Sequence, residues 1–188
     1  MKFDCIVLDP PWQYRKKETG GTLISGSNYK YPTLQFKELK DLSSLIKQVS
    51  KPDCVMFLWV TNPMIQEGLE LLEIYGFEYK TLITWVKGNT FGLGYWYRGN
   101  TEHIILGTKG KIKAFRTQEI NVFHSDIREH SQKPIKSYEL IEQGIKSIDK
   151  NCKVLEIFAR RQYKDWICIG YDIDGLDVHD SLELISKK

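Results

Sequence analysis

The sequence predicts an α/β protein in which a doubly wound, mostly parallel β-sheet carries helices on both faces. Two observations predict this fold class: apolar runs of strand length recur along the chain, and stretches of helical periodicity lie between them. No internal repeat or low-complexity linker divides the sequence. A length of 188 residues suits one domain with a substantial core, so we expect a single domain over residues 1–188, with a short C-terminal tail from about residue 176.

Strands are predicted where short apolar runs end at polar or turn-forming residues. These runs cover residues 3–8, 54–60, 79–86, 102–106, 153–157 and 166–170. Helices are predicted where apolar side chains recur three and four positions apart, over residues 33–49, 62–76 and 134–148, with Thr33 as the first N-cap. The last two strands are so close in sequence that they form either a hairpin or a parallel pair with a short crossover.

Three long segments, residues 13–32, 88–100 and 109–133, have no predicted secondary structure. Loops longer than about 12 to 15 residues are uncommon unless they are functional or disordered. These three are rich in glycine, lysine and aromatic residues, and we expect them to hold a substrate at one edge of the sheet.

Composition places the chain among ordinary globular proteins, with 41% hydrophobic and 27% charged residues. No apolar run approaches the ~20 residues that span a bilayer, and the first residues do not resemble a signal peptide. The four cysteines are widely spaced within apolar stretches and form no C-x-x-C pair. We therefore expect buried free thiols, no metal site, no membrane contact and a cytoplasmic location.

The net charge of +3 is too small to indicate a nucleic-acid-binding protein, but basic residues cluster at three places. The clusters are residues 15–17, 109–116 and 160–161. Each is by itself most simply a solvated surface. If all three lie beside the site, they form a phosphate-binding rim.

The tetrapeptide Asp9-Pro10-Pro11-Trp12 directly follows the first predicted strand. Ligands bind at the carboxyl ends of such strands in open α/β sheets. Asp9 offers a hydrogen-bond acceptor, the prolines stiffen the turn and keep their carbonyls available, and Trp12 offers a flat aromatic surface. This combination suits a planar ring with an amino group, such as adenine, although a proline-rich turn with a core tryptophan is the plain structural alternative.

Six spaced motifs extend this pattern along the chain. They are residues 9–12 (DPPW), 57–60 (FLWV), 85–87 (WVK), 102–103 (EH), 131–134 (SQKP) and 156–160 (EIFAR). Together and in this order they resemble the MT-A70 family of adenine methyltransferases, in its permuted motif arrangement. The resemblance implies a Rossmann-like fold, S-adenosylmethionine as cofactor, and methyl transfer to the 6-amino group of adenine in nucleic acid. DNA is favoured over RNA because the chain lacks the extra domains of relatives that act on messenger RNA.

The resemblance also implies roles for individual residues. Asp9 and the carbonyl of Pro10 would accept hydrogen bonds from the adenine amino group, while Pro11 and Trp12 would enclose or stack the base. The implied cofactor-binding residues are Ser131, Lys133, Phe158, Arg160, Gln162, Tyr171 and Asp172, with Asp174 as a competitor for the ribose. Ala159 and Arg161 depart from the family's usual glycine and proline.

Substrate contacts are expected from basic, aromatic and polar residues near the motifs: Arg15, Lys16, Trp96, Arg98, Asn100 and Glu102. His103 is expected to be structural rather than an acid–base group. The expected partners are nucleic acid and a second methyltransferase-fold subunit, in a homodimer or heterodimer. Two rival functions stay open at this stage: a non-catalytic nucleic-acid-binding subunit, and an enzyme acting on a small adenine-containing metabolite.

Overall fold

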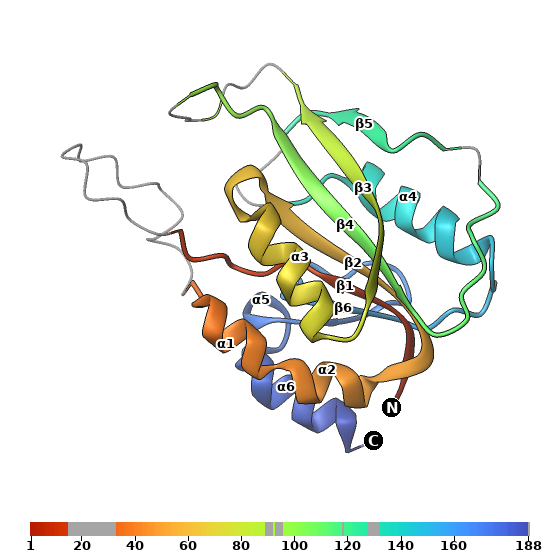
Figure 1. The fold of residues 1–188 in the computed structure, drawn as a ribbon. Helices are drawn as coiled ribbons and strands as arrows, with labels where there is room; N and C mark the ends of the chain where they lie inside the picture. The colour runs from red at the N-terminus through yellow and green to blue at the C-terminus, as the bar shows by residue number, and fades with distance from the viewer. Residues whose placement is uncertain (15–32, 89–91, 93–95, 118, 128–131, 188) are drawn as a thin grey trace.

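The computed structural model describes residues 1–14, 33–88, 92, 96–117, 119–127 and 132–187 (Figure 1). These residues form a seven-stranded sheet in the order β5-β3-β4-β2-β1-β6-β7. The strands are β1 (Phe3–Leu8), β2 (Ser50–Thr61), β3 (Glu78–Lys87), β4 (Thr101–Lys109), β5 (Val122–Ser125), β6 (Val154–Ile157) and β7 (Ile167–Ile169).

Six of these strands run in one direction, and only β4 is antiparallel to its neighbours β2 and β3. The predicted mostly parallel sheet is therefore confirmed. The pair β6–β7 is parallel, so the short-crossover alternative holds and the hairpin is excluded. The strand β5 was not predicted, because in its four residues only Phe123 is buried and no apolar run marks it.

The helices are α1 (Phe36–Asp41), α2 (Ser43–Val49), the 3₁₀ turn η2 (Asn62–Met64), α3 (Ile65–Ile74), α4 (Ile135–Lys146), α5 (Tyr171–Asp174) and α6 (Val178–Ser186). Helices α1, α2, α3 and α6 pack their apolar side chains on one face of the sheet, and α4 packs on the other (Figure 1). Helices therefore cover both faces, as expected for a doubly wound sheet.

The first predicted helix differs from the structure in two ways. It begins at Phe36 rather than after Thr33, because the Glu38 carboxylate accepts a hydrogen bond from the backbone nitrogen of Gln35 at 2.6 Å and so stabilises Gln35 as the N-cap. It is also interrupted at Leu42, which ends α1 and begins α2. Apolar periodicity continues through this break, so periodicity alone did not reveal it.

The two ends of the chain lie side by side (Figure 1). The N-terminal ammonium donates a hydrogen bond to the carbonyl of Ile185 at 2.9 Å. The segment expected as a tail from about residue 176 contains α6, whose Val178, Leu182 and Ile185 are buried in the core. In the described part of the chain, no helix is both long and apolar enough to cross a membrane. All four cysteines are free thiols, as predicted; Cys5, Cys54 and Cys168 are buried, whereas Cys152 is only partly buried.

Candidate active site

The candidate site lies at the carboxyl edge of the sheet, where six strands end. Asp9 follows β1, Phe158 follows β6, Gly170 follows β7, and Lys87 is the last residue of β3. Glu102 reaches the same edge from the start of β4, because that strand runs in the opposite direction. Residues from five strands therefore meet at the edge where open α/β sheets bind their ligands.

Four charged side chains form an alternating ion-pair network at this edge. The Lys133 ammonium lies 2.9 Å from Oδ1 of Asp9 and 3.1 Å from Oε2 of Glu102. The other oxygen of Glu102 accepts from the Lys87 ammonium at 2.5 Å. All four side chains are largely shielded from solvent. Buried charges are tolerated when they are paired, and here two carboxylates balance two ammonium groups.

Two tryptophan rings support the ammonium groups. Lys133 Nζ lies 4.9 Å from the ring centroid of Trp59, and Lys87 Nζ lies 5.2 Å from that of Trp85. The two rings pack edge to face at 6.2 Å. Because a cation is attracted to the face of an indole ring, these contacts hold both lysines in place without adding a further charge.

The pKa values in the network follow from burial and from the neighbouring charges. Burial raises the pKa of Asp9, and Lys133 opposes this only in part. Burial also acts to raise the pKa of Glu102, but Lys133 and Lys87 together outweigh it and hold that pKa below the ordinary value. For Lys133, burial acts to lower the pKa, but Asp9 and Glu102 outweigh it and the pKa is raised. Lys133 is therefore charged at neutral pH, and Asp9 is the carboxylate that protonates more easily.

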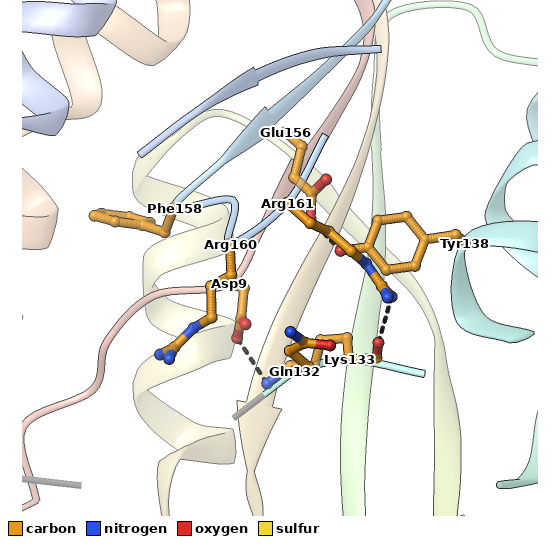
Figure 2. Close-up of a pocket in the computed structure, with 8 residues that line it drawn as sticks. All are labelled: Asp9, Gln132, Lys133, Tyr138, Glu156, Phe158, Arg160 and Arg161. Atoms are coloured by element: carbon orange, nitrogen blue, oxygen red, sulfur yellow. Dashed lines mark hydrogen bonds and ion pairs between the residues drawn. The ribbon is translucent and has the colours of Figure 1, made fainter. Parts of the chain in front are cut away.

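A pocket opens beside Asp9 on the β6 side of the network (Figure 2). It is lined by Asp9, Gln132, Lys133, Tyr138, Glu156, Phe158, Arg160 and Arg161. Figure 2 shows the Arg160 side chain running alongside Asp9. The pocket thus joins the tetrapeptide, the residues that precede α4, and the loop after β6.

The loop after β6 is held in an unusual backbone conformation. Phe158 has a φ of 64°, which is uncommon for a residue with a side chain. Gly170, at the end of β7, lies directly against this loop: a Cβ there would meet the carbonyl oxygen of Ala159 at 2.7 Å and its nitrogen at 2.9 Å. The missing side chain therefore allows the end of β7 to approach the loop after β6 closely, next to the pocket-lining residues Phe158 and Arg160.

Arg161 and Tyr138 also line the pocket; Arg161 belongs to one of the three predicted basic clusters, and Tyr138 was not predicted as a site residue. The Arg161 guanidinium donates to the carbonyl oxygen of Lys133 at 2.6 Å and lies 4.7 Å from the Tyr138 ring centroid. The Tyr138 hydroxyl donates to the buried carboxylate of Glu156 at 2.7 Å. Burial raises the pKa of Glu156 to about 7. Only the basic pair at residues 160–161 pointed to this part of the pocket in the sequence.

The tetrapeptide is more constrained than the sequence suggested. The carbonyl of Pro10 accepts from the Trp12 backbone nitrogen at 2.8 Å, and that of Pro11 accepts from Leu34 at 2.9 Å. The Trp12 indole nitrogen donates to the carbonyl of Trp59 at 3.0 Å, and only 6% of Trp12 is exposed. Each proline carbonyl keeps a second lone pair for a further donor. The expectation of a presented tryptophan ring is corrected: Trp12 anchors the turn in the core, because its indole nitrogen has a buried partner.

The other expected cofactor-binding residues are spread around the edge of the site. The Gln162 side-chain nitrogen donates to the carbonyl of Trp166 at 2.6 Å and so closes the β6–β7 loop. Tyr171 and Asp172 follow Gly170 and are exposed at the end of β7. The competitor Asp174 instead accepts from the Ser181 hydroxyl at 2.8 Å, within the C-terminal segment. Ser131, like the expected substrate residues Arg15 and Lys16, lies outside the described residues.

Three further expected substrate residues, Trp96, Arg98 and Asn100, lie in the described part of the connection between β3 and β4. Trp96 is 94% exposed, Tyr97 is 91% exposed, and Arg98 is also exposed. The carbonyl of Asn100 accepts from the Lys87 nitrogen at 2.9 Å and closes this connection at its base.

The basic cluster at residues 109–116 lies away from the site, contrary to the prediction. Lys109 ends β4 at the opposite edge of the sheet, where its ammonium donates to the Ser50 hydroxyl at the start of β2. The cluster therefore does not rim the site, because β4 runs antiparallel and carries it away.

Several polar residues on the β2 side of Asp9 also belong to the site surroundings. The Tyr14 hydroxyl and the Thr61 hydroxyl are hydrogen-bonded at 3.0 Å. His103 Nε2 lies 2.8 Å from Asn62 Oδ1, and its Nδ1 lies 3.0 Å from the Thr84 hydroxyl. Both ring nitrogens are engaged, as expected for a structural histidine. Tyr14 lies only two residues after the tetrapeptide, which is the signal by which it could have been found.

Comparison with known proteins decides the family. The family model MT-A70 matches residues 3–172 of this chain. The chain belongs to the MT-A70 family. This confirms the predicted family and the enzyme class that it implies, an adenine methyltransferase. Each of the six MT-A70 motifs contributes a residue to the ion-pair network, to the pocket, or to the ring that supports Lys133: Asp9, Trp59, Lys87, Glu102, Lys133 and Arg160.

The similar proteins are of two kinds, a Type II methyltransferase and N(6)-adenosine-methyltransferases. The Type II methyltransferase M.MunI of Mycoplasma sp is 31% identical, and the match covers 96% of this chain and 79% of that protein. Human N(6)-adenosine-methyltransferase catalytic subunit METTL3 is 29% identical over 95% of this chain, but the match covers only 30% of METTL3. A probable N(6)-adenosine-methyltransferase of Oryza sativa is 29% identical, with 24% of its length covered.

Proposed function

We propose that this chain uses S-adenosylmethionine to methylate the 6-amino group of adenine in DNA. The observation that carries the proposal is the position of the Asp9 carboxylate. It follows the interior strand β1 and is held by Lys133 at 2.9 Å, with the pocket on the β6 side and the ends of β2 and β4 on the other. A group reaching Asp9 from the β2 side therefore faces the pocket across it.

Asp9 would act on the adenine amino group by charge and orientation. The lone pair of that nitrogen is delocalised into the ring, so the nitrogen is a weak nucleophile. Lys133 binds one oxygen of the carboxylate, and a carboxylate has acceptor capacity for further donors. A hydrogen bond to Asp9 would orient the amino group, and the negative charge would stabilise the positive charge that develops on nitrogen during transfer.

The residues around the pocket fit the cofactor by their chemistry. S-adenosylmethionine supplies an electrophilic methyl group on a sulfonium, and it carries a carboxylate, an ammonium and a ribose. Lys133 lines the pocket and has three donors, of which two are directed at Asp9 and Glu102. Its third donor would bind the cofactor carboxylate. Phe158 and the close approach at Gly170 would enclose the cofactor, and Asp172 would hold the ribose hydroxyls.

The other residues predicted from the sequence would complete the cofactor site and the substrate contacts. Ser131, Arg160, Gln162 and Tyr171 would complete the cofactor site. On the substrate side, Glu102 would keep Lys133 in place, and Trp96 and Arg98 would contact the nucleotides that flank the target adenine. Arg15, Lys16 and Asn100 would complete those contacts.

DNA is proposed as the substrate because of the likeness to a Type II methyltransferase. This chain is 31% identical to the Type II methyltransferase M.MunI over 96% of its own length. The second subunit expected from the sequence would be a further copy of the chain or a related methyltransferase-fold protein.

The test is transfer of a labelled methyl group from S-adenosylmethionine to duplex DNA, single-stranded DNA and RNA of the same mixed sequence. Digestion to nucleosides should locate the label on the 6-amino group of deoxyadenosine, and the duplex should be labelled most. An adenine-free oligonucleotide serves as the control and should stay unlabelled. Preferential labelling of RNA would overturn the choice of DNA. Cofactor binding without transfer to any nucleic acid would instead support the non-catalytic subunit.

A further inference from the structure

Trp12 was expected to present an aromatic surface to the substrate, but it is buried, and the exposed aromatic ring nearby is that of Tyr14. Trp12 is only 6% exposed, and its indole nitrogen is bound to the carbonyl of Trp59. Two residues later, Tyr14 is 40% exposed. The chain between them is fixed in position, because the nitrogen of Gln13 donates to the carbonyl of Leu34 at 3.2 Å. Tyr14 therefore projects from a firmly held segment.

The Tyr14 ring is anchored at its hydroxyl end. The hydroxyl bonds to the Thr61 hydroxyl at 3.0 Å, at the last residue of β2. Burial of this end raises the pKa of Tyr14, and the charges of Glu102, Lys133 and Asp9 also act on it. Thr61 is the direct partner of Glu102 in the β2–β4 pairing, so the Tyr14 hydroxyl lies beside the ion-pair network, while 40% of Tyr14 remains exposed to solvent.

The strand order places Tyr14 opposite the pocket. In the sheet, β2 lies on one side of β1 and β6 lies on the other. The pocket occupies the β6 side of Asp9, and Tyr14 with Thr61 occupies the β2 side. In methyl transfer, the sulfonium that donates the methyl group and the amino nitrogen that accepts it must face each other. With the cofactor in the pocket on one side of Asp9, the base therefore has to come from the other side. A base that presents its amino group to Asp9 from the β2 side comes against the Tyr14 ring.

We propose that Tyr14 is the aromatic side chain against which the target adenine lies while its amino group is bound by Asp9. This proposal rests on the proposed function and adds the base-contacting surface on the substrate side. Stacking needs the flat ring, and the hydroxyl serves to anchor the ring on Thr61. Tyr14→Phe keeps the stacking surface, and Tyr14→Ala removes it.

The first test is steady-state methyl transfer to adenine-containing duplex DNA. Base–aromatic stacking commonly contributes enough that Tyr14→Ala should lower kcat/KM for DNA about 5- to 100-fold. The affinity for S-adenosylmethionine, measured by calorimetry, should stay within about twofold of wild type. Tyr14→Phe should retain at least about a third of the wild-type kcat/KM. The matched control is Tyr79→Ala: this tyrosine is 47% exposed near the start of β3, at the opposite sheet edge, and its loss should leave kcat/KM unchanged.

A second test does not depend on turnover. Binding of oligodeoxyadenylate is compared with binding of an abasic oligonucleotide of equal length, both in the presence of S-adenosylhomocysteine. Tyr14→Ala should weaken binding of the adenine oligonucleotide about 5- to 100-fold and leave binding of the abasic one unchanged. Equal weakening of both, or no weakening of either, overturns the proposal, as does a Tyr14→Phe defect as large as that of Tyr14→Ala. If wild-type protein transfers no methyl group, the proposed function fails, and this binding comparison still decides the role of Tyr14.

Discussion

The ammonium of Lys133 lies 2.9 Å from the carboxylate of Asp9, and this ion pair joins the cofactor side of the site to the substrate side. Lys133 precedes α4, on one face of the sheet, whereas Asp9 follows the interior strand β1. Glu102 binds the same ammonium at 3.1 Å and so shares it with Asp9. Because the same ammonium binds both carboxylates, the pKa of Asp9 and its capacity to accept a hydrogen bond from the substrate depend on Glu102 as well as on Lys133.

Glu102→Gln should shift the pH dependence of the enzyme. Asp9 must be ionised to stabilise positive charge on the adenine nitrogen, so the rate falls as pH drops through the pKa of Asp9. Burial raises that pKa, and the charge of Glu102 raises it further. When a neutral glutamine replaces the glutamate, the repulsion is gone and Lys133 serves Asp9 alone, so the acid limb of kcat against pH should move to lower pH.

The control for this profile is Glu183→Gln on α6, where the glutamate pairs with Lys187 at 2.9 Å and lies outside the network. Its acid limb should coincide with that of wild type. An acid limb for Glu102→Gln at the wild-type pH or above would show that Glu102 does not govern Asp9.

Gly170→Ala should damage both the fold and the cofactor site. A Cβ at residue 170 would meet the backbone of Ala159 at 2.7–2.9 Å, and backbone atoms cannot move aside as a flexible side chain can. We expect a loss of about 3 kcal/mol in the free energy of unfolding, measured with urea, and at least a tenfold weaker affinity for S-adenosylmethionine.

Gly175→Ala is the matched substitution. Gly175 has a φ of 71° but nothing within 4 Å of the added carbon, so only backbone strain should appear. We expect about 1 kcal/mol of destabilisation and unchanged cofactor affinity. Equal effects of the two substitutions on cofactor affinity would contradict the importance of the close approach at Gly170.

Glu156→Gln should alter how stability depends on pH. Burial raises the pKa of Glu156 to about 7 from 4.5, so between these values the folded state binds more protons than the unfolded state. The free energy of unfolding of wild type therefore falls as pH rises through this window, by about 3 kcal/mol from this group. The glutamine variant lacks this loss and still accepts from the Tyr138 hydroxyl.

Urea unfolding of both proteins at pH 4.5, 6 and 8 measures the effect. The stability of Glu156→Gln relative to wild type should increase with pH across this range. A constant difference between the two proteins would show that Glu156 titrates normally in the folded state.

Most of the fold could be predicted from the sequence because buried strands and helix faces leave local runs and periodic spacings of apolar residues. The run from Cys54 to Val60 is apolar because β2 is central and buried on both sides, and Gly76 has the positive φ expected at the end of a helix. The reversal of β4 and the existence of β5 were not predicted, since strand direction depends on long-range pairing and β5 buries only one side chain. The position of the basic cluster after Lys109 depended on that reversal.

The candidate site was predicted in part for a related reason. Asp9, Glu102 and Lys133 belong to motifs whose residue types indicate their chemistry, although nothing in the sequence shows that they meet. The orientation of Trp12 was misjudged, because its burial depends on a hydrogen bond to Trp59, 47 positions away. Tyr14 was not predicted as a site residue: its closeness to the tetrapeptide was the one signal in the sequence, and its anchor, Thr61, is 47 positions away at the end of the neighbouring strand β2.

The most direct test of the account is Asp9→Asn, assayed by transfer of labelled methyl groups and by calorimetric titration with S-adenosylmethionine. The substitution keeps the size of the side chain and removes its charge, and Lys133 retains Glu102 as a partner. We expect transfer to adenine to fall at least about 100-fold, with cofactor affinity within about threefold of wild type. Turnover near the wild-type level in a folded Asp9→Asn protein would contradict the central role of this carboxylate.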